Sequence, residues 1–583
     1  MGHPGRGSLV STPHRCSKTS INTQVKVSTL PEKGRHWIQQ VADEVEAYVD
    51  LAKPPAEPIV CASGISPSGP IHVGNLREVM TVHLIAEELR SRGRQVDHVH
   101  SWDDYDRLRK VPNGIPLEFE AQIGRPLAQI PDPFGEHDSF ASRFISEFES
   151  ALSRLAIHPR YVRQSQAYTS GAYTPLILRA MEKRLEIFDI LREYQTRAPQ
   201  DDADAEVSRR SDYFPFKVYC EDCGRDTTQL DRYSEETSEL SYHCLFRPYA
   251  GSFVLRDRVA GKPPWKVDWP LRWFHERVDF EPGGLDHAAP GSSYTVGQRI
   301  VSTVFGGRAP KFIGYAFVGM AGRSKMSSST GATATPRAAL DILEPAILRW
   351  LYIRRQPSQQ FDINFGHEVW RLYDEWDSFV KRVTSGNASE TDNYTYAMCI
   401  GTSAGRVEQS DIPVPFRIIA SGADITQGNR QQLLRIVNAH LQAPWDNDEQ
   451  LERSVEPRLS CAINWAVRYQ PEDERTAIRT EFDTATFQRL PDSHRQGIEL
   501  LLHRLDSDWT LHGLSTLIYG IPKLLVGRSE DAEPDDVIRE AQRSFFRSLY
   551  ELICGKDTGP RLPTLFLSIG REKVHQLLAP HSE

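Results

Sequence analysis

One loop rich in glycine, serine and proline constrains this chain more than any other stretch. It spans residues 62–72, between the apolar run Pro58–Cys61, which predicts a buried strand, and a helix predicted from Val73 to about Gly93. Unpaired N–H groups and the positive end of the helix dipole make such a helix start suitable for an anion. An ordinary turn between strand and helix is the alternative interpretation.

A second loop, far downstream, favours the anion-binding interpretation. Residues 322–331 read Gly-Arg-Ser-Lys-Met-Ser-Ser-Ser-Thr-Gly, with Lys325 among small hydroxyl residues. By itself this stretch is also typical of a solvated loop. Taken together with His72-Val73-Gly74-Asn75, it resembles the two signatures of the class I aminoacyl-tRNA synthetases, and the order and separation of the two motifs suit that family.

Further segments resemble class I lysyl-tRNA synthetase in particular. They are Ser101–Pro112, Val267–Trp273, Val278–Pro282 and Asp286–Ala288. The similarity runs from about His36 to Leu562, nearly the whole chain. It implies an α/β fold with a Rossmann-like nucleotide-binding catalytic domain that is split by an insertion. An all-α C-terminal anticodon-binding domain is expected to follow.

The domain boundaries come from the same resemblance and from the change in pattern along the chain. Residues 107–265 lack clear alternation of strands and helices, and beyond Pro336 strands give way to helical patterns. We predict a disordered N-terminal extension at 1–34, the first half of the Rossmann catalytic domain at 35–106, a connective insertion with a zinc knuckle at 107–265, the second half with the Lys325 loop at 266–335, a stem-contact helical segment at 336–400 and the α-helical anticodon-binding domain at 401–583.

Length and composition limit the kinds of partner and the compartment that we expect for this chain. A chain of 583 residues needs more than one core. Its net charge of -9 argues against a general nucleic-acid binder, so no DNA partner is expected, although a local basic face can still bind tRNA. No apolar run reaches the roughly 20 residues that span a bilayer, so no membrane partner is expected. Eight scattered cysteines fit a reducing compartment, and we predict a cytoplasmic protein.

The resemblance implies a reaction in two steps. The carboxylate of L-lysine attacks the α-phosphorus of ATP, which enters with Mg²⁺, and the lysyl group of the resulting adenylate passes to tRNA(Lys). His72, Asn75 and Lys325 are the expected catalytic residues. The expected ATP-binding residues are His72, Gly74, Asn75, Lys325, Met326, Ser327 and Ser329. Many relatives carry a second lysine in or just after this loop, where Ser328 and Thr330 stand here.

Selection of lysine requires an acid near its ε-ammonium group and aromatic rings along its stem. Glu78 lies on the same predicted helix as His72, at the position of the family's specificity glutamate. The predicted lysine-binding residues are Gly64, Ser66, Glu78, Trp265, Trp269, His287 and Tyr315. For each aromatic residue, simple core packing is the alternative. The acidic tract Asp103–Asp106 is expected to have a structural role beside the site.

The insertion carries a candidate metal site. Cys220-Glu-Asp-Cys223 is a good half-site for zinc because two thiolates on one tight turn can share a tetrahedral ion. The second half, His243-Cys244, is poor because its two residues are adjacent. We predict Cys220, Cys223, His243 and Cys244 as ligands of a structural Zn²⁺, and a small loop with free thiols is the alternative.

Three other functions remain open at this stage. A glutamate-specific enzyme is disfavoured, because it would need a basic residue where Glu78 stands. A paralogue could transfer activated lysine to an acceptor other than tRNA. A non-catalytic RNA-binding protein on a synthetase scaffold would not need His72, Gly74, Asn75 and Lys325 together.

Overall fold

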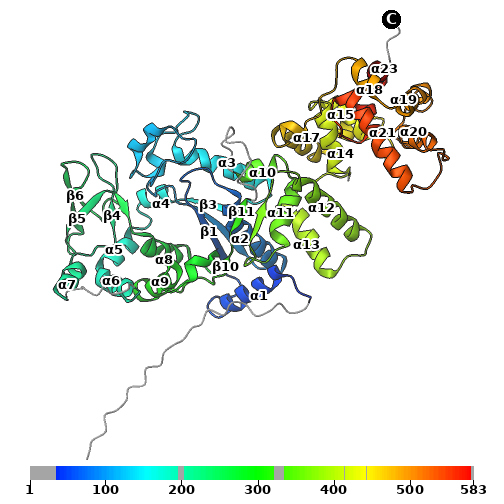
Figure 1. The fold of residues 1–583 in the computed structure, drawn as a ribbon. Coiled ribbons are helices and arrows are strands. Elements are labelled where there is room, and N and C mark those ends of the chain that lie inside the picture. Colours follow the sequence, from blue (N-terminus) through cyan, green and yellow to red (C-terminus); the bar gives the residue numbers. More distant parts are fainter. Residues whose placement is uncertain (1–33, 195–202, 321–333, 413, 442, 580–583) are drawn as a thin grey trace, which may run out of the picture.

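A parallel sheet lies at the centre of the N-terminal part of the chain (Figure 1). The computed structural model describes residues 34–194, 203–320, 334–412, 414–441 and 443–579. Strand β1 (Ile59–Ile65) pairs in parallel with β2 (Val96–Trp102), and β2 pairs in parallel with β3 (Arg160–Arg163). The strand predicted at 96–102 is confirmed, because β2 has the same bounds.

The chain returns to this sheet after the insertion. Phe280 bridges Cys61 of β1 on one side and Lys311 on the other, both in parallel. Just beyond, β9 (Gly283–Gly284) pairs in parallel with β10 (Gly314–Tyr315). The isolated bridges at Phe280 therefore connect the two parts of the chain that the insertion separates. The predicted fold class, a split Rossmann-like α/β domain, is confirmed.

The sheet differs from the prediction in two places. Strand β3 lies within residues 107–265, all of which were assigned to the insertion, and the helix α3 (Phe140–Arg154) leads into it. This strand escaped notice because it is short, begins and ends with arginine and contains no buried residue. In addition, β1 continues to Ile65, so Gly64 lies on a strand that pairs with β2, and the loop proper is shorter than expected.

Helices cover the sheet and fill the insertion. Helix α1 (Trp37–Asp50) packs on α2 (Val73–Ser91), which follows β1. The remaining elements up to residue 320 are α4 (Gln164–Thr169), α5 (Thr174–Glu182), α6 (Arg184–Glu193), α7 (Ala203–Ser211), β4 (Lys217–Val218), β5 (Thr228–Tyr233), β6 (Glu239–Cys244), β7 (Ala250–Val254), β8 (Gly261–Lys262), α8 (Trp265–Glu276), α9 (Ser293–Ile300) and β11 (Val318–Met320). Strands β5, β6 and β7 form a small antiparallel sheet within the insertion.

The C-terminal part is helical, as predicted. Its elements are α10 (Pro336–Leu340), α11 (Pro345–Ile353), β12 (Phe361–Ile363), α12 (Glu368–Thr384), α13 (Glu390–Ile400), β13 (Gly401–Thr402), β14 (Gly405–Arg406), α14 (Phe416–Ile425), α15 (Arg430–Ala439), α16 (Asp448–Val455), α17 (Arg458–Arg468), α18 (Thr484–Arg489), α19 (Asp492–Arg504), α20 (Leu511–Leu525), α21 (Asp536–Cys554), α22 (Leu562–Ile569) and α23 (Arg571–Leu578). Figure 1 shows α14–α23 as a lobe beyond α12. Within the described ranges, none of the helices combines the length and the apolar character that crossing a lipid bilayer demands.

Two of the apolar clusters in the described residues bear on the predicted domain boundaries. One apolar cluster runs from Trp37 to Ala466, and a separate cluster in the lobe spans Ile425 to Leu578. The boundaries themselves stay predictions. The predicted extension at 1–34 lies, apart from Gly34, outside the described residues.

Candidate active site

The loop after β1 ends in a histidine that caps helix α2. The Nδ1 atom of His72 accepts a hydrogen bond from the N–H of Gly74 at 3.0 Å. Partial burial lowers the pKa of His72, which favours the neutral ring at pH 7. Because Nδ1 is the acceptor, the proton of the neutral ring lies on Nε2. His72 therefore offers one Nε2–H donor at a helix start, an arrangement suited to a phosphate oxygen.

Gly74 is required by two close contacts. A Cβ atom at this position would lie 2.7 Å from Cε1 and Nδ1 of His72 and 3.0 Å from the carbonyl oxygen of Val318. Any side chain would therefore displace the His72 ring or push α2 away from β11. Strand β11 leads directly into the segment that carries Lys325. The glycine thus lets the first loop approach the strand from which the second loop begins.

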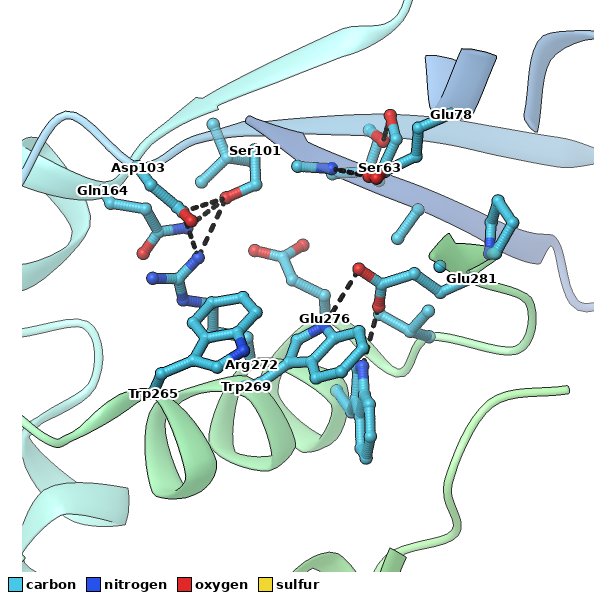
Figure 2. Close-up of a pocket in the computed structure, with 18 of the residues that line it drawn as sticks. Ser63, Glu78, Ser101, Asp103, Gln164, Trp265, Trp269, Arg272, Glu276 and Glu281 are labelled. Carbon is cyan, nitrogen blue, oxygen red and sulfur yellow. Dashed lines mark hydrogen bonds and ion pairs between the residues drawn. The ribbon is translucent and has the colours of Figure 1, made fainter. Parts of the chain in front are cut away.

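A cavity of about 150 Å³ lies beside this loop, between the central strands and helix α8 (Figure 2). Its walls come from β1, α2, β2 and Asp103 after it, β3, the start of α4, α8 and residues 278–287. The carboxyl ends of parallel strands are the usual place for a ligand in an open α/β sheet. The cavity combines several carboxylates with a row of indole rings, so its chemistry suits a ligand that is both cationic and aliphatic.

Glu78 reaches this cavity from α2. Its Oε1 accepts a hydrogen bond from the N–H of Gly64 at 2.7 Å, and its Oε2 accepts one from the hydroxyl of Tyr315 at 2.6 Å. Burial raises the pKa of Glu78 to about 8, although both hydrogen bonds act in the opposite direction. The carboxyl group is therefore fixed in orientation and mostly protonated at neutral pH. A cationic ligand beside it would favour the ionised form.

Tryptophans of α8 form an aromatic wall. The rings of Trp265 and Trp269 stack with centroids 5.1 Å apart and planes 18° from parallel. The ring of His287 meets Trp269 edge-on, with centroids 5.6 Å apart. Flat indole faces suit the methylene groups of an extended side chain and attract a nearby cation.

A buried network of charges supports the same helix. Arg272 of α8 forms ion pairs with Asp103 at the end of β2 and with Asp268, whose Oδ2 lies 2.5 Å from Nη2. Lys262 of the insertion lies 2.9 Å from Asp268 and 2.6 Å from Asp106. The network ties the sheet, α8 and the insertion together around the cavity. Asp103 also lines the cavity itself, in addition to the structural role that was expected of it.

The structure brings most of the predicted lysine-binding residues together. Those that line the cavity are Gly64, Glu78, Trp265, Trp269 and His287. Tyr315 holds Glu78 through the hydrogen bond described above. Ser66 lies in an adjoining groove of about 490 Å³, which shares Asp103 with the cavity. The roles of these residues as ligands of lysine stay predictions.

The predicted nucleotide-binding residues are described only in part. Asn75 donates its backbone N–H to the carbonyl of His72 at 2.9 Å, within the first turn of α2. The other four predicted residues, Lys325, Met326, Ser327 and Ser329, lie outside the described residues. Their roles, too, stay predictions.

Arg272 and Glu281 are among the cavity residues that sequence reasoning missed. Both stand in segments that resemble the family, Val267–Trp273 and Val278–Pro282, but neither was given a role. The apolar pair at 278 and 280 could have indicated a strand, with Glu281 at its carboxyl end. A charged residue at that position of an α/β sheet is a candidate for the ligand site.

The candidate metal site contains three of its four predicted ligands. The sulfur atoms of Cys220, Cys223 and Cys244 lie within 4.8 Å of one another. His243 does not join them, and its Nδ1 lies 2.6 Å from Asp231. The physical reason is the alternation of β6, which points neighbouring side chains to opposite faces of the strand. The choice of His243 as a ligand was therefore wrong. In the part of the chain that the structure describes, no fourth His, Cys, Asp or Glu completes the cluster.

Comparison with known proteins agrees with this arrangement. The split parallel sheet and the loop before α2 define an α/β nucleotide-binding protein, and the family described as "tRNA synthetases class I (K)" matches residues 35–402. The chain belongs to this family. It is 43% identical to the lysine–tRNA ligase of Streptomyces coelicolor, over 93% of this chain and 98% of the relative. It is 32% identical to that of Thermococcus kodakarensis, over 92% and 98%, and 31% identical to that of Treponema pallidum, over 94% and 99%.

Proposed function

We propose that the protein attaches L-lysine to tRNA(Lys) in two ATP-dependent steps, through lysyl-adenylate. Its relatives across nearly the whole chain are named lysine–tRNA ligases. The observation that carries the proposal is Glu78, a buried carboxyl group held by two hydrogen bonds in a cavity walled by indoles. Such a site suits an ammonium group at the end of an aliphatic chain.

In the first step the chain acts mainly by positioning its two substrates. The ε-ammonium of lysine pairs with Glu78, and its methylene groups lie against Trp269. ATP binds at the loop before α2, where the Nε2–H of His72 donates to its phosphates and Lys325 follows the departing pyrophosphate. Mg²⁺ enters with ATP and neutralises part of its charge. The lysine carboxylate then attacks the α-phosphorus, a reaction that depends on alignment and on stabilisation of developing charge.

The charge of the cavity disfavours glutamate as the substrate. Glu78, Glu281 and Asp103 all line it. The one described cation among the lining residues, Arg272, is already paired with Asp103 and Asp268. A second carboxylate on the substrate would therefore meet acids without a free cation.

For the second step we propose that the 3′ end of tRNA enters through the groove that adjoins the cavity. Arg107, Arg109 and Lys217 line this groove and supply cations for phosphates. The insertion would lie along the acceptor stem, with residues 336–400 on the stem and the helices of 401–583 at the anticodon. An acceptor other than tRNA would leave these outer regions without a role.

We also propose that Cys220, Cys223 and Cys244 hold a structural Zn²⁺. Thiolates are preferred zinc ligands, and the N–H groups of Phe246 and Arg247 each lie 3.4 Å from the sulfur of Cys244. These three thiolates would hold the ion and join the turn at Cys220–Cys223 to strand β6. The seven described cysteines form no disulfide, and a cytoplasmic location belongs to the same proposal.

ATP–pyrophosphate exchange tests the function. Purified protein is assayed with lysine, glutamate or arginine, with and without tRNA, and charging of tRNA(Lys) is then measured. We expect exchange with lysine and charging of the tRNA. Exchange without charging would favour another acceptor, and no exchange with any amino acid under either condition would favour the non-catalytic alternative.

A matched pair of variants tests the lysine site. Glu78→Gln removes the negative charge and should raise the KM for lysine about 100-fold, because a buried pairing with the substrate is lost, while the KM for ATP stays close to that of the wild type. Glu57→Gln changes an exposed glutamate of a loop and serves as the control. If Glu78→Gln raises both KM values equally, Glu78 is not the lysine ligand.

A further inference from the structure

Glu281 occupies the end of a segment that joins the central sheet. Its neighbour Phe280 lies between β1 and Lys311, and the N–H of Glu281 donates to the carbonyl of Lys311 at 3.1 Å. From this fixed backbone the side chain enters the cavity, where it is only 8% exposed. Glu281 is thus a buried carboxyl group on a rigid element, at the wall of the proposed lysine site.

Both carboxylate oxygens of Glu281 are used by indole rings. Oε1 accepts a hydrogen bond from Nε1 of Trp269 at 3.0 Å, and Oε2 accepts one from Nε1 of Trp273 at 2.7 Å (Figure 2). The two tryptophans are four residues apart on α8, so they lie on the same face of the helix. One carboxyl group therefore fixes the orientation of two rings at once.

The buried position of the Glu281 carboxyl group has an energetic cost. Burial of a carboxylate between neutral groups is unfavourable, and burial raises the pKa of Glu281 to about 7 although both indoles lower it. An apolar side chain in the same space would avoid that cost but would leave the N–H groups of Trp269 and Trp273 without this acceptor. Glu281 also acts on Glu78, because its charge contributes, after burial, to the raised pKa of Glu78.

We propose that Glu281 is a positioning and specificity residue for lysine. It holds the ring of Trp269 in place against the methylene chain of the substrate. Its negative charge adds to that of Glu78, so that the cavity takes a ligand with a cationic end. This inference rests on the proposed function, because it assumes that lysine occupies the cavity.

The test compares three variants of the full-length protein in ATP–pyrophosphate exchange. Glu281→Gln keeps the shape of the side chain but can accept from only one indole with its single remaining oxygen. Trp269→Phe keeps an aromatic wall but removes the N–H that Glu281 holds. The third variant combines both changes, and Glu57→Gln is the control. The KM for lysine, the KM for ATP and kcat are measured for each, together with the thermal midpoint.

We expect Glu281→Gln to raise the KM for lysine by about tenfold or more, since hydrogen bonds to a charged group are lost, with the KM for ATP within about twofold of the wild type. Trp269→Phe should act in the same direction. If Glu281 acts through Trp269, the rise in the lysine KM of the double variant should be clearly smaller than the product of the rises in the two single variants.

Several results would overturn the proposal. A lysine KM within about twofold of the wild type in Glu281→Gln would do so, as would equal increases in both KM values, or effects that multiply fully in the double variant. A fall in thermal midpoint alone indicates a merely structural role. Should Glu281→Gln fail to fold, the KM values of Trp269→Phe decide in the same way. If the wild type shows no exchange with lysine, the proposed function itself is wrong. This result comes from the wild type alone and does not depend on the variants.

Discussion

The loop before α2 and the cavity beside it differ in how far apart in the chain their interacting residues lie. In the loop, the hydrogen bond from Gly74 to His72 joins residues two positions apart. In the cavity, the bond from Tyr315 to Glu78 spans 237 positions, and the contact of Arg272 with Asp103 spans 169. The loop therefore depends on local backbone geometry, whereas the cavity depends on the packing of the whole catalytic region. We therefore expect substitutions in the loop and substitutions in the cavity to have different effects on the protein.

The largest effect on stability is expected for the buried ion pairs that support the cavity. Asp268→Asn removes a fully buried charge that pairs with Arg272 and Lys262, and should lower the free energy of unfolding by about 3–5 kcal/mol. Asp97→Asn, which breaks the half-exposed pair with Arg160, should cost no more than about 1 kcal/mol. Urea unfolding of both variants provides the measurement. Equal losses would mean that the buried network does not support the cavity.

A change in the loop should affect rate more than stability. His72→Ala removes the Nε2–H donor, and we expect kcat for pyrophosphate exchange to fall about 10²–10³-fold, as for the loss of one donor to a transition state. The lysine KM should change little, because His72 does not line the cavity. Gly74→Ala should give the same pattern by displacing the His72 ring. A large rise in the lysine KM would show that loop and cavity are not separable.

Two buried acids of the cavity, Glu78 and Glu281, predict how stability depends on pH. Burial raises the pKa of Glu78 to about 8 and that of Glu281 to about 7, above the value of about 4.3 in an unfolded chain. The folded state therefore binds more protons, and the contribution of each group to stability, fully present below about pH 4.3, is lost as pH rises toward its folded pKa, by up to about 1.4 kcal/mol per pH unit.

Denaturant unfolding at several pH values between 5 and 8 tests this dependence. Glu78→Gln should show a smaller decline in the free energy of unfolding with rising pH than the wild type, because the substituted amide does not titrate. Saturating lysine should also reduce the decline, since it favours the ionised carboxylate. Curves for the wild type and the variant that run parallel over this range would contradict the raised pKa.

The smallest effect on exchange is expected at the metal site, which lies in the insertion. Cys223→Ser should reduce bound zinc, measured by elemental analysis of the purified protein, to well below one ion per chain. His243→Ala should leave the zinc content unchanged, because His243 lies beside Asp231 and away from the sulfur cluster. Zinc loss in His243→Ala would restore the four-ligand interpretation, and zinc-free wild type would favour the free thiols.

Local features were within reach of sequence reasoning. Helix α2 follows from a Gly-rich loop before an apolar period of helical spacing, and β2 was predicted from the run Val96–Trp102, which contains two valines and a tryptophan, residues favoured in strands. Strand β3 was missed because it has only four residues, of which the first and last are arginines and none is buried. His243 was misassigned because adjacency in sequence hides the alternation of a strand, which becomes visible only once β6 is known.

The sequence by itself determined the loop, the order of the two halves of the sheet and the acid expected at position 78. Only the tertiary structure decided that Glu281 holds two indoles, that Arg272 lies between Asp103 and Asp268, and that three thiols meet without His243. The reason is the range of the forces involved. Turn geometry and helix capping act over a few residues, so the local sequence specifies them. Burial and pairing of charges depend on which distant segments pack together, and that is a property of the whole fold.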